Sequence, residues 1–231
     1  MLKTAFFYLA LAALVSLFVA WLAHRWLPSN LNPFAPLSMS EQPSFITQFK
    51  IARLKSDPGQ CFAILEASQL SFDYVSDKET GESCGFFNTL RLKQSGISYG
   101  GNITLTCPAL VALGMWEYNH VQPLATEILG QKVQKIKHYG TYSCRNINSA
   151  KKGRRSQHAY ANAIDIAGFQ LQDGSSVSVL LNGPEDTEKG EFIRAMHNTA
   201  CDYFKTVLGP KYNDLHQDHF HFDMGPSFVC R

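Results

Sequence analysis

The sequence predicts an α+β fold, in which a small antiparallel sheet is flanked by helices and one transmembrane helix stands at the N-terminus. Residues 5–23 form an uncharged apolar run, which is long enough to cross a bilayer as a helix. Behind it, β-rich and helical segments follow each other irregularly, which is typical of α+β domains rather than of a doubly wound sheet. The pair Asp173-Gly174 between two β-rich arms is a strong hairpin signal.

The N-terminal run reads AFFYLALAALVSLFVAWLA, with Lys3 before it and His24-Arg25 after it. These nearly balanced charges do not fix an orientation by the positive-inside rule. A cleavable signal peptide is the alternative, but bulky Trp21 and Trp26 leave no small-residue cleavage site. We therefore expect residues 1–26 to remain as an anchor.

Six dispersed cysteines without a CxxC pair follow the apolar run. In an exported chain this pattern predicts three disulfides formed in an oxidising compartment, and it lacks the paired spacing of a cysteine-rich zinc site. The sequence leaves the pairing open; we favour Cys201 with Cys230 and Cys61 with Cys84. The expected location is a single pass of the inner membrane with the domain in the periplasm. The six candidates are Cys61, Cys84, Cys107, Cys144, Cys201 and Cys230.

The chain has 231 residues, a net charge of +2 and 17% charged residues, so it lacks the basic excess of a nucleic-acid-binding protein. Residues 27–45 contain four prolines with several Ser and Asn. We expect this stretch to be a linker that holds the domain off the membrane. The globular domain is then residues 46–231.

The first half of the domain is expected to combine short helices and strands. A short helix is predicted in 57–68, and strands are predicted at 86–92 and 102–106. The next helix starts at Thr106, which can cap it, has Pro108 in its first turn, and runs through residues 109–119. It can bend at Pro123.

The second half begins with an alternating segment, 132–145, that predicts one or two strands. Residues 162–181 predict the hairpin around Asp173-Gly174. A helix is predicted over 187–208, because apolar residues recur there at helical spacing, and Gly209-Pro210 would end it. Residues 219–224 predict a final strand. The apolar positions of the predicted helix are Phe192, Met196, Ala200, Phe204 and Val207.

The run HQDHFHFD, residues 216–223, leads into the final strand. Because side chains alternate along a strand, His219 and His221 would share one face and Phe220 and Phe222 the opposite, core face. Asp223 would share the imidazole face and could serve there as an outer partner. Neutral imidazoles together with a carboxylate are typical ligands of catalytic zinc.

A second group lies in the segment SQHAYANAID. His158 falls in a turn and Asp165 at the start of a strand, with the small-residue-rich AYANAI between them. That stretch can fold back tightly enough to bring both side chains to one ion. Together the two segments supply the three protein ligands of a catalytic zinc site, which leaves a fourth position for water.

These motifs carry a resemblance to known families. The pattern S-x-H-x(6)-D, followed by D-x-x-H overlapping H-x-H, resembles the superfamily of zinc D-Ala-D-Ala peptidases, lysostaphin-type enzymes and the hedgehog signalling domain. More closely, SQHAYANAIDIAGF with HQDHFHFD and dispersed cysteines is similar to the bacterial extensin-like C-terminal domain family. The resemblance covers about residues 55–231.

The resemblance implies that zinc is held by His158, Asp165 and His221. It implies that Asp218 or His219 is the general base, which deprotonates a water molecule activated by the metal or stabilises developing charge.

The resemblance also implies substrate contacts. Ser156 and Arg145 would bind substrate, although an arginine at position 145 is equally suited to a structural ion pair. The family pattern leads us to expect Glu at position 157, where this chain has Gln157. This departure removes a charge beside the expected metal site without removing a ligand.

The resulting expectation is a membrane-anchored zinc peptidase that hydrolyses amide bonds in peptidoglycan stem peptides or cross-links. The alternative is a catalytically inactive zinc domain that binds cell-wall material or a protein partner, and a wall-associated protein without metal is a further rival.

The sequence lacks the G-x-S-x-G and H-E-x-x-H motifs, and oxidised cysteines would not be nucleophiles. His216 is expected to be an outer or surface residue, and Arg154 and Arg155 a solvated turn.

Overall fold

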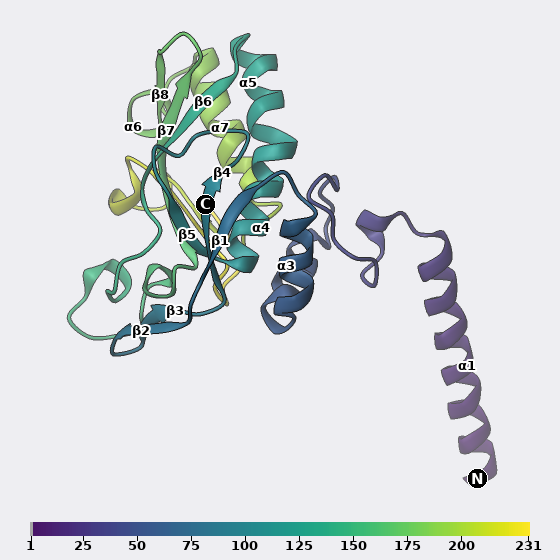
Figure 1. Ribbon diagram of the computed structural model, residues 1–231. Helices are drawn as coiled ribbons and strands as arrows, with labels where there is room; N and C mark the ends of the chain where they lie inside the picture. The colour runs from purple at the N-terminus through teal and green to yellow at the C-terminus, as the bar shows by residue number, and fades with distance from the viewer. Residues whose placement is uncertain (1) are drawn as a thin grey trace.

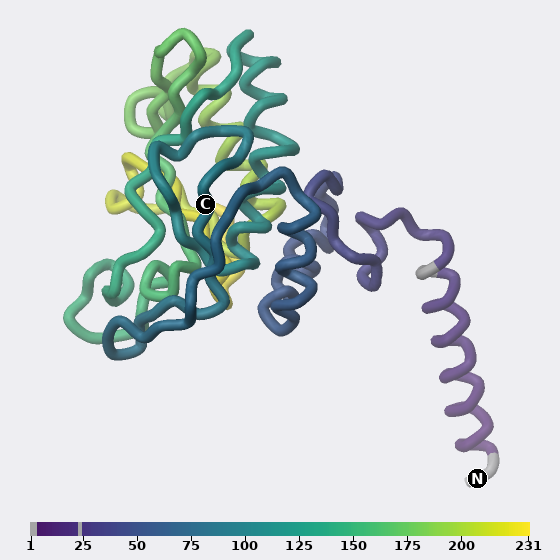
Figure 2. The backbone as a smooth tube through the Cα atoms, viewed as in Figure 1, coloured from purple at the N-terminus to yellow at the C-terminus, as the bar shows by residue number. Residues whose placement is uncertain are grey.

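The computed structural model describes residues 2–231, apart from the side chains of residues 2, 3, 23 and 24. Helix α1 (Leu2–Trp26) contains an apolar span, Thr4–Leu22, that is long enough to cross a membrane. The helix projects away from the folded body (Figures 1 and 2). Lys3 and His24, two of the charged or titratable residues that flank the apolar span, have side chains outside the described ones.

The segment between α1 and the domain is partly packed. It contains a short 3₁₀ helix, η1 (Ser29–Leu31), and Asn32, Leu37 and Glu41 are buried. The Lys50 ammonium group bonds to Glu41 Oε1 at 2.7 Å and to the Ser29 carbonyl at 3.0 Å. A stretch that composition describes as a linker is therefore fastened to the domain along much of its length.

Two helices open the domain. Helix α2 (Thr47–Arg53) continues into the 3₁₀ helix η2 (Leu54–Ser56), and α3 (Pro58–Glu66) lies within the predicted segment 57–68. Asp57 caps α3, since its carboxylate accepts from Gln60 N at 3.0 Å, and Pro58 occupies the first turn, where its missing N–H costs nothing.

A three-stranded antiparallel sheet follows, in the order β1–β4–β5. The expected strands at 86–92 and 102–106 correspond mainly to β4 and β5. A separate hairpin, β2 with β3, lies between β1 and β4 in the chain. The bounds are β1 Ser71–Val75, β2 Lys78–Gly81, β3 Cys84–Phe86, β4 Thr89–Gln94 and β5 Ile103–Thr106.

The central helix is interrupted once. Helix α4 (Cys107–Trp116) passes through a π-helical segment, η3 (Glu117–Val121), into α5 (Gln122–Leu129). Thr106 occupies the N-cap position, but its hydroxyl donates to Asn162 Oδ1 instead of capping the helix. Pro123 follows the π-helical turn and lies in the first turn of α5.

The main sheet has the strand order β11–β9–β10–β7–β6, with β8 also paired to β7. All pairs are antiparallel except β11 with β9. The predicted hairpin is formed by β7 and β8, with Gly174 at φ +85° in the turn. The strands are β6 Val133–Gly140, β7 Ala163–Leu171, β8 Ser176–Ser178, β9 Thr206–Leu208, β10 Phe220–Asp223 and β11 Val229–Cys230.

The helix predicted over 187–208 is wrong in its second half. Helix α7 (Glu188–Ala200) ends before Cys201, and a turn leads into β9. Phe204 and Val207 are buried, but they reach the core from that turn and strand. Their spacing continued the helical pattern by coincidence, so Gly209-Pro210 follows a strand and does not end the helix.

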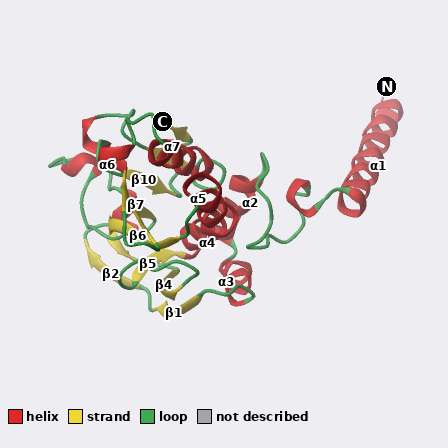
Figure 3. Ribbon diagram, turned by 90° about the horizontal axis from the view of Figure 1, so that it is seen from above, coloured by secondary structure: helices red, strands yellow, loops and turns green. Residues whose placement is uncertain are grey.

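The core lies between the main sheet and the helices α4, α5 and α7, which gather on one side of β10, β7 and β6 (Figure 3). The Trp116 ring centre lies 5.5 Å from that of Phe222 on β10 and 6.3 Å from that of Phe169 on β7. The domain is thus a mixed α+β structure. A short helix, α6 (Val179–Asn182), follows β8.

Three disulfides connect these layers: Cys61–Cys107, Cys84–Cys144 and Cys201–Cys230. The expected Cys201–Cys230 pair is confirmed. The expected Cys61–Cys84 pair is wrong, because Cys61 lies on α3 and bonds to the first residue of α4. Cys84 of the β2–β3 hairpin instead bonds to Cys144 beyond β6.

Candidate functional site

Strand pairing places the first two site residues opposite each other. His221 of β10 is the direct cross-strand partner of Asp165 of β7, and directly opposed residues on one face lie within contact distance. Phe220 and Phe222 are buried on the other face, as the alternation predicts. The His221 Nδ1 atom lies 2.9 Å from Asp165 Oδ1.

His158 reaches the same point from a short 3₁₀ helix, η5 (Gln157–Tyr160), just before β7. The Ser156 hydroxyl oxygen accepts from the His158 amide at 3.3 Å and so caps this turn. His158 Nε2 lies 3.0 Å from Asp165 Oδ2 and 3.2 Å from His221 Nδ1. Two imidazole nitrogens and one carboxylate therefore converge.

Outer hydrogen bonds orient both rings. His158 Nδ1 lies 3.3 Å from the Thr141 carbonyl, which can only accept, so Nδ1 carries the proton of that bond. His221 Nε2 lies 2.9 Å from Asp223 Oδ2, so Nε2 donates in the same way. In the neutral rings, the nitrogens that face Asp165 then carry lone pairs. These lone pairs can be satisfied by a metal ion, or by protons through which the rings then donate to Asp165.

The electrostatics of the cluster agree with this reading. Burial disfavours ionisation of Asp165, but hydrogen bonds from His158 and His221 outweigh it and hold the pKa of Asp165 well below its ordinary value. Burial likewise opposes the charged form of His221, but hydrogen bonds to Asp165 and Asp223 raise its pKa to about 9. The cluster attracts positive charge.

A second pair lies beside the first. Asp218 Oδ1 lies 2.8 Å from His219 Nδ1, and the Tyr139 hydroxyl donates to Asp218 Oδ2 at 3.1 Å. The hydrogen bond with His219 lowers the pKa of Asp218. The other ring nitrogen, His219 Nε2, lies 3.7 Å from Asp165 Oδ1. The carboxylate therefore orients an imidazole whose free nitrogen faces the cluster.

His216 extends the imidazole group. It lies at the end of η6 (Asp214–His216), and its ring centre is 5.3 Å from that of His219. Burial, and after it the charges of His221 and His219, lower the pKa of His216 to about 4. Near neutral pH this imidazole is uncharged and lines the cleft beside the cluster.

The groups open into a cavity of about 740 Å³. Arg145 and Ser156, the expected substrate-binding residues, line it together with Asp165, His219 and His221. Asp218, the other expected catalytic residue, stands behind His219. The structure thus brings five of the seven sequence-predicted site residues to the cavity lining, and the other two, His158 and Asp218, contact Asp165 and His219 of that lining.

One part of the cavity lining is basic. It is formed around η4 (Ile147–Ser149) and includes Arg145, Arg154 and Arg155. Arg155 is engaged structurally, since it donates to Asn146 Oδ1 at 3.1 Å and to the Glu82 carbonyl at 2.7 Å. No ion pair involves Arg145 or Arg154 within the described part of the chain, so their charges face the cavity unneutralised.

Two site residues were missed in the sequence. Tyr139 and Thr141 lie at the end of β6 and just beyond it, and they touch Asp218 and His158. The alternating pattern of 132–145 marked a strand there, but nothing in it shows that β6 pairs with β7 so that Gly140 lies opposite Asp165. Only the pairing reveals their role.

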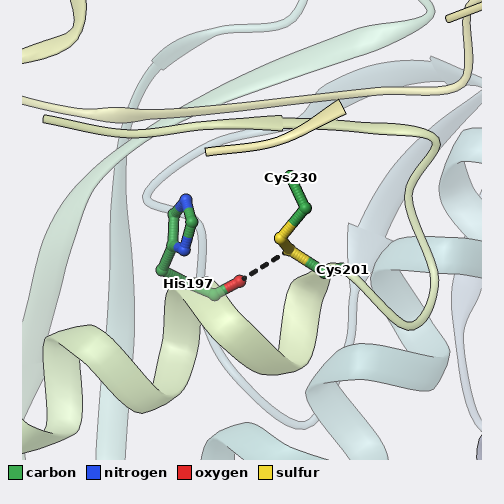
Figure 4. Close-up of side chains that lie close together, drawn as sticks. All are labelled: His197, Cys201 and Cys230. Atoms are coloured by element: carbon green, nitrogen blue, oxygen red, sulfur yellow. Dashed lines mark hydrogen bonds between the residues drawn. A yellow bond between two sulfur atoms is a disulfide. The ribbon is translucent and has the colours of Figure 1, made fainter. Parts of the chain in front are cut away.

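Two other features lie away from this site. His197, Cys201 and Cys230 lie close together (Figure 4), but both sulfurs belong to one disulfide and are not thiolate ligands. A larger cavity of about 1110 Å³ lies between α3, the π-helical turn and residues 36–40. Its lining is mainly apolar and lacks histidine, so we place the chemistry in the smaller cleft.

The comparisons with known proteins agree with the sequence motifs. The family described as extensin-like protein C-terminus matches residues 59–231, which include every residue of the cleft. No curated protein and no solved structure matches the chain.

Proposed function

The chain belongs to the extensin-like protein C-terminal family, and we propose that it is a zinc-dependent peptidase that hydrolyses amide bonds in peptidoglycan stem peptides or cross-links. The observation that carries the proposal is the convergence of His158 Nε2, Asp165 and His221 Nδ1 within 3.2 Å of one another. The resemblance of the two sequence motifs to those of the D-Ala-D-Ala peptidase and lysostaphin superfamily leads to the same proposal.

The donor set fits zinc. Zinc takes imidazole nitrogen and carboxylate oxygen at 2.0–2.2 Å, which puts neighbouring tetrahedral ligands about 3.3 Å apart. The separations of 2.9 to 3.2 Å between these donor atoms need little adjustment to reach that spacing. Zinc bound by His158, Asp165 and His221 would supply an acidified water molecule and polarise the scissile carbonyl.

We assign the general base to His219 rather than to Asp218. Nε2 of His219 faces the cluster, whereas the Asp218 carboxylate bonds to the far nitrogen of that ring. In this arrangement His219 Nε2 takes up a proton in the cleft, and Asp218 holds the ring in place and stabilises the resulting imidazolium. Tyr139 fixes Asp218 from the other side.

The cleft chemistry suggests the substrate class. Arg145 and Arg154 present positive charge to the cavity, which suits a peptide with free carboxylates. Stem peptides of peptidoglycan carry such carboxylates and occur outside the cytoplasm. The apolar helix α1 and three disulfides fit an extracytoplasmic domain on a membrane anchor or behind a signal sequence. We propose an inner-membrane anchor and a periplasmic domain.

The test uses the purified full-length chain in detergent. We expect about one zinc per chain by elemental analysis, and muropeptide cleavage, followed by mass spectrometry, that a chelator abolishes and zinc restores. His221→Ala should lose both zinc and cleavage, whereas His219→Ala should keep zinc and lose cleavage. The control is His197→Ala, a histidine outside the cleft.

Two results would overturn the proposal in different ways. Full cleavage by His221→Ala would remove the metal site from the mechanism. Stoichiometric zinc without cleavage of any muropeptide bond would instead support the inactive zinc domain that binds wall material or a protein partner.

A further inference from the structure

Three phenylalanines near the start of the domain are exposed to an unusual degree. Phe34, Phe45 and Phe49 have 63%, 88% and 54% of their surface accessible. Single exposed apolar side chains are common on protein surfaces, but a contiguous group of them marks an interaction surface. Whether these three form such a group depends on their contacts.

Contacts of neighbouring residues hold the segments that carry the three phenylalanines together. The Arg53 guanidinium carbon lies 5.7 Å from the centre of the Phe49 ring, and Arg53 Nη1 donates to the Pro33 carbonyl at 2.8 Å. Phe34 follows Pro33 directly. Phe45 precedes α2, and its neighbour Ser44 donates to the Asn30 carbonyl. We call Phe34, Phe45, Phe49 and the exposed Arg53 the aromatic surface.

The aromatic surface lies a short chain length from the end of α1. Lys50 of α2 holds the Ser29 carbonyl at 3.0 Å, and α1 ends at Trp26. Three residues span at most about 11 Å when fully extended. The chain therefore keeps this side of the domain next to the end of the anchor, in agreement with the place of α2 on the α1 side of the domain (Figure 3).

We propose that the aromatic surface rests on the same membrane that α1 enters. The phenylalanine rings would enter the interfacial layer, and Arg53 and Lys55 would lie among lipid phosphates. The short fastened connection argues for the bilayer as the occupant, because any other partner would have to fit within that distance of the anchor. The proposal depends on membrane insertion of α1 and not on the chemistry of the cleft.

This docking fixes the direction of the cleft. Helix α2 packs on the side of α4 away from the main sheet (Figure 3), and the Trp116 ring of α4 meets the inner face of β10 at Phe222. His221 stands on the opposite face of that strand. With the aromatic surface on the bilayer, the cleft opens away from the membrane, toward material outside it.

The test places a photoreactive benzoylphenylalanine at position 45 of the full-length chain in vesicles of phosphatidylethanolamine and phosphatidylglycerol. After irradiation, mass spectrometry identifies adducts on the peptide that contains residue 45. The matched control carries the same residue at Phe228, which is 67% exposed and stands in the chain between the cleft-lining residues Ser227 and Val229. Both positions are exposed, so neither replacement disturbs the core.

We expect lipid adducts at position 45 at least tenfold more abundant than at position 228. Equal lipid adducts at the two positions would overturn the proposal. Crosslinks from position 45 to a second copy of the chain, without lipid adducts, would overturn it as well and identify a dimer surface instead. Capture of neither lipid nor protein at position 45 would show a surface exposed to water and would also contradict it.

Discussion

His221 donates a hydrogen bond from Nε2 to Asp223 Oδ2 at 2.9 Å, while its Nδ1 faces Asp165. Asp223 Oδ1 in turn accepts from the Gly225 amide at 2.7 Å, so the carboxylate is itself held in place. An outer carboxylate of this kind fixes the tautomer of a metal-binding histidine and increases its basicity.

Replacement of this outer carboxylate should weaken metal binding without removing a ligand. Asp223→Asn keeps the shape but loses the charge, and zinc affinity should fall by about 10–100-fold. Competition with a chromophoric chelator measures the change. Asp214→Asn, an exposed carboxylate two residues before His216, is the control and should leave affinity unchanged. Equal affinities for Asp223→Asn and the parent chain would contradict the ligand role of His221.

The Asp218–His219 pair should separate turnover from metal content. His219→Ala should lower kcat by about 10²–10⁴-fold, the usual contribution of a general base. Asp218→Asn should lower kcat less, because the imidazole remains but loses its orienting carboxylate, and KM should change little in both. Zinc content stays at the parent level. A larger loss in Asp218→Asn than in His219→Ala would reverse the roles that we assign to the two residues.

The final strand shows how far sequence alone leads. Histidine and phenylalanine alternate from His219 to Phe222. This alternation predicts both the strand and its two faces, because side chains on any strand point alternately to opposite sides, whichever strands pair with it. The small residues between His158 and Asp165 already predict that these two side chains meet at one ion, whereas the choice of His221 as the third ligand depends on a resemblance. The physical reason for it is the antiparallel pairing of β10 with β7, which no local pattern encodes.

The errors have a similar origin. The helix predicted over 187–208 extended a true periodicity past Ala200, since buried apolar residues on a turn and a short strand imitate helical spacing. The predicted Cys61–Cys84 pair joined two cysteines that follow each other in the chain. Cys61 instead bonds to Cys107, because α3 packs on α4. Both cases depend on tertiary contacts between segments distant in the chain.

Glu117 should make the stability of the domain depend on pH. Burial raises its pKa to about 6 from 4.5, in part offset by hydrogen bonds from Tyr99, Ser95 and the Ile97 amide. Between about pH 4.5 and 6 the folded state therefore binds more protons than the unfolded state, and the free energy of unfolding falls as pH rises. The loss is complete above pH 6 and amounts to about 2 kcal/mol.

Glu117→Gln removes this titration. The free energy of unfolding is measured for both chains by denaturant titration from pH 4.5 to 7.5, and that of the parent chain should fall by about 2 kcal/mol relative to that of Glu117→Gln as pH rises through this range. Glu127→Gln on α5 is the control, because it changes the same residue type at an exposed position. A decline of the same size in Glu117→Gln and the parent chain would assign the pH dependence to other groups.

The Cys84–Cys144 disulfide should support the basic wall of the cleft as well as stability. It joins residues 60 positions apart, and the loss of such a crosslink costs about 4 kcal/mol in the chain-entropy treatment. Arg145 follows Cys144 directly, so the double replacement of both cysteines by serine should also raise KM for an anionic peptide. Replacement of Cys201 and Cys230, separated by 29 residues, should cost somewhat less stability and leave Arg145 in place. An unchanged KM in the first variant would contradict the link between this disulfide and the cleft.

The buried pair of Lys50 and Glu41 tests whether residues 27–45 are fastened to the domain. Both side chains are only 3% accessible, and the loss of one partner leaves a buried charge uncompensated. Glu41→Ala should therefore lower the free energy of unfolding by about 3–5 kcal/mol, whereas Glu41→Leu combined with Lys50→Met should cost far less. Denaturant titration measures both, and limited proteolysis should show faster cleavage within 27–45 in Glu41→Ala alone. A loss below about 1 kcal/mol with unchanged proteolysis would mean that this segment moves freely, and the fixed distance between α1 and the aromatic surface would then no longer hold.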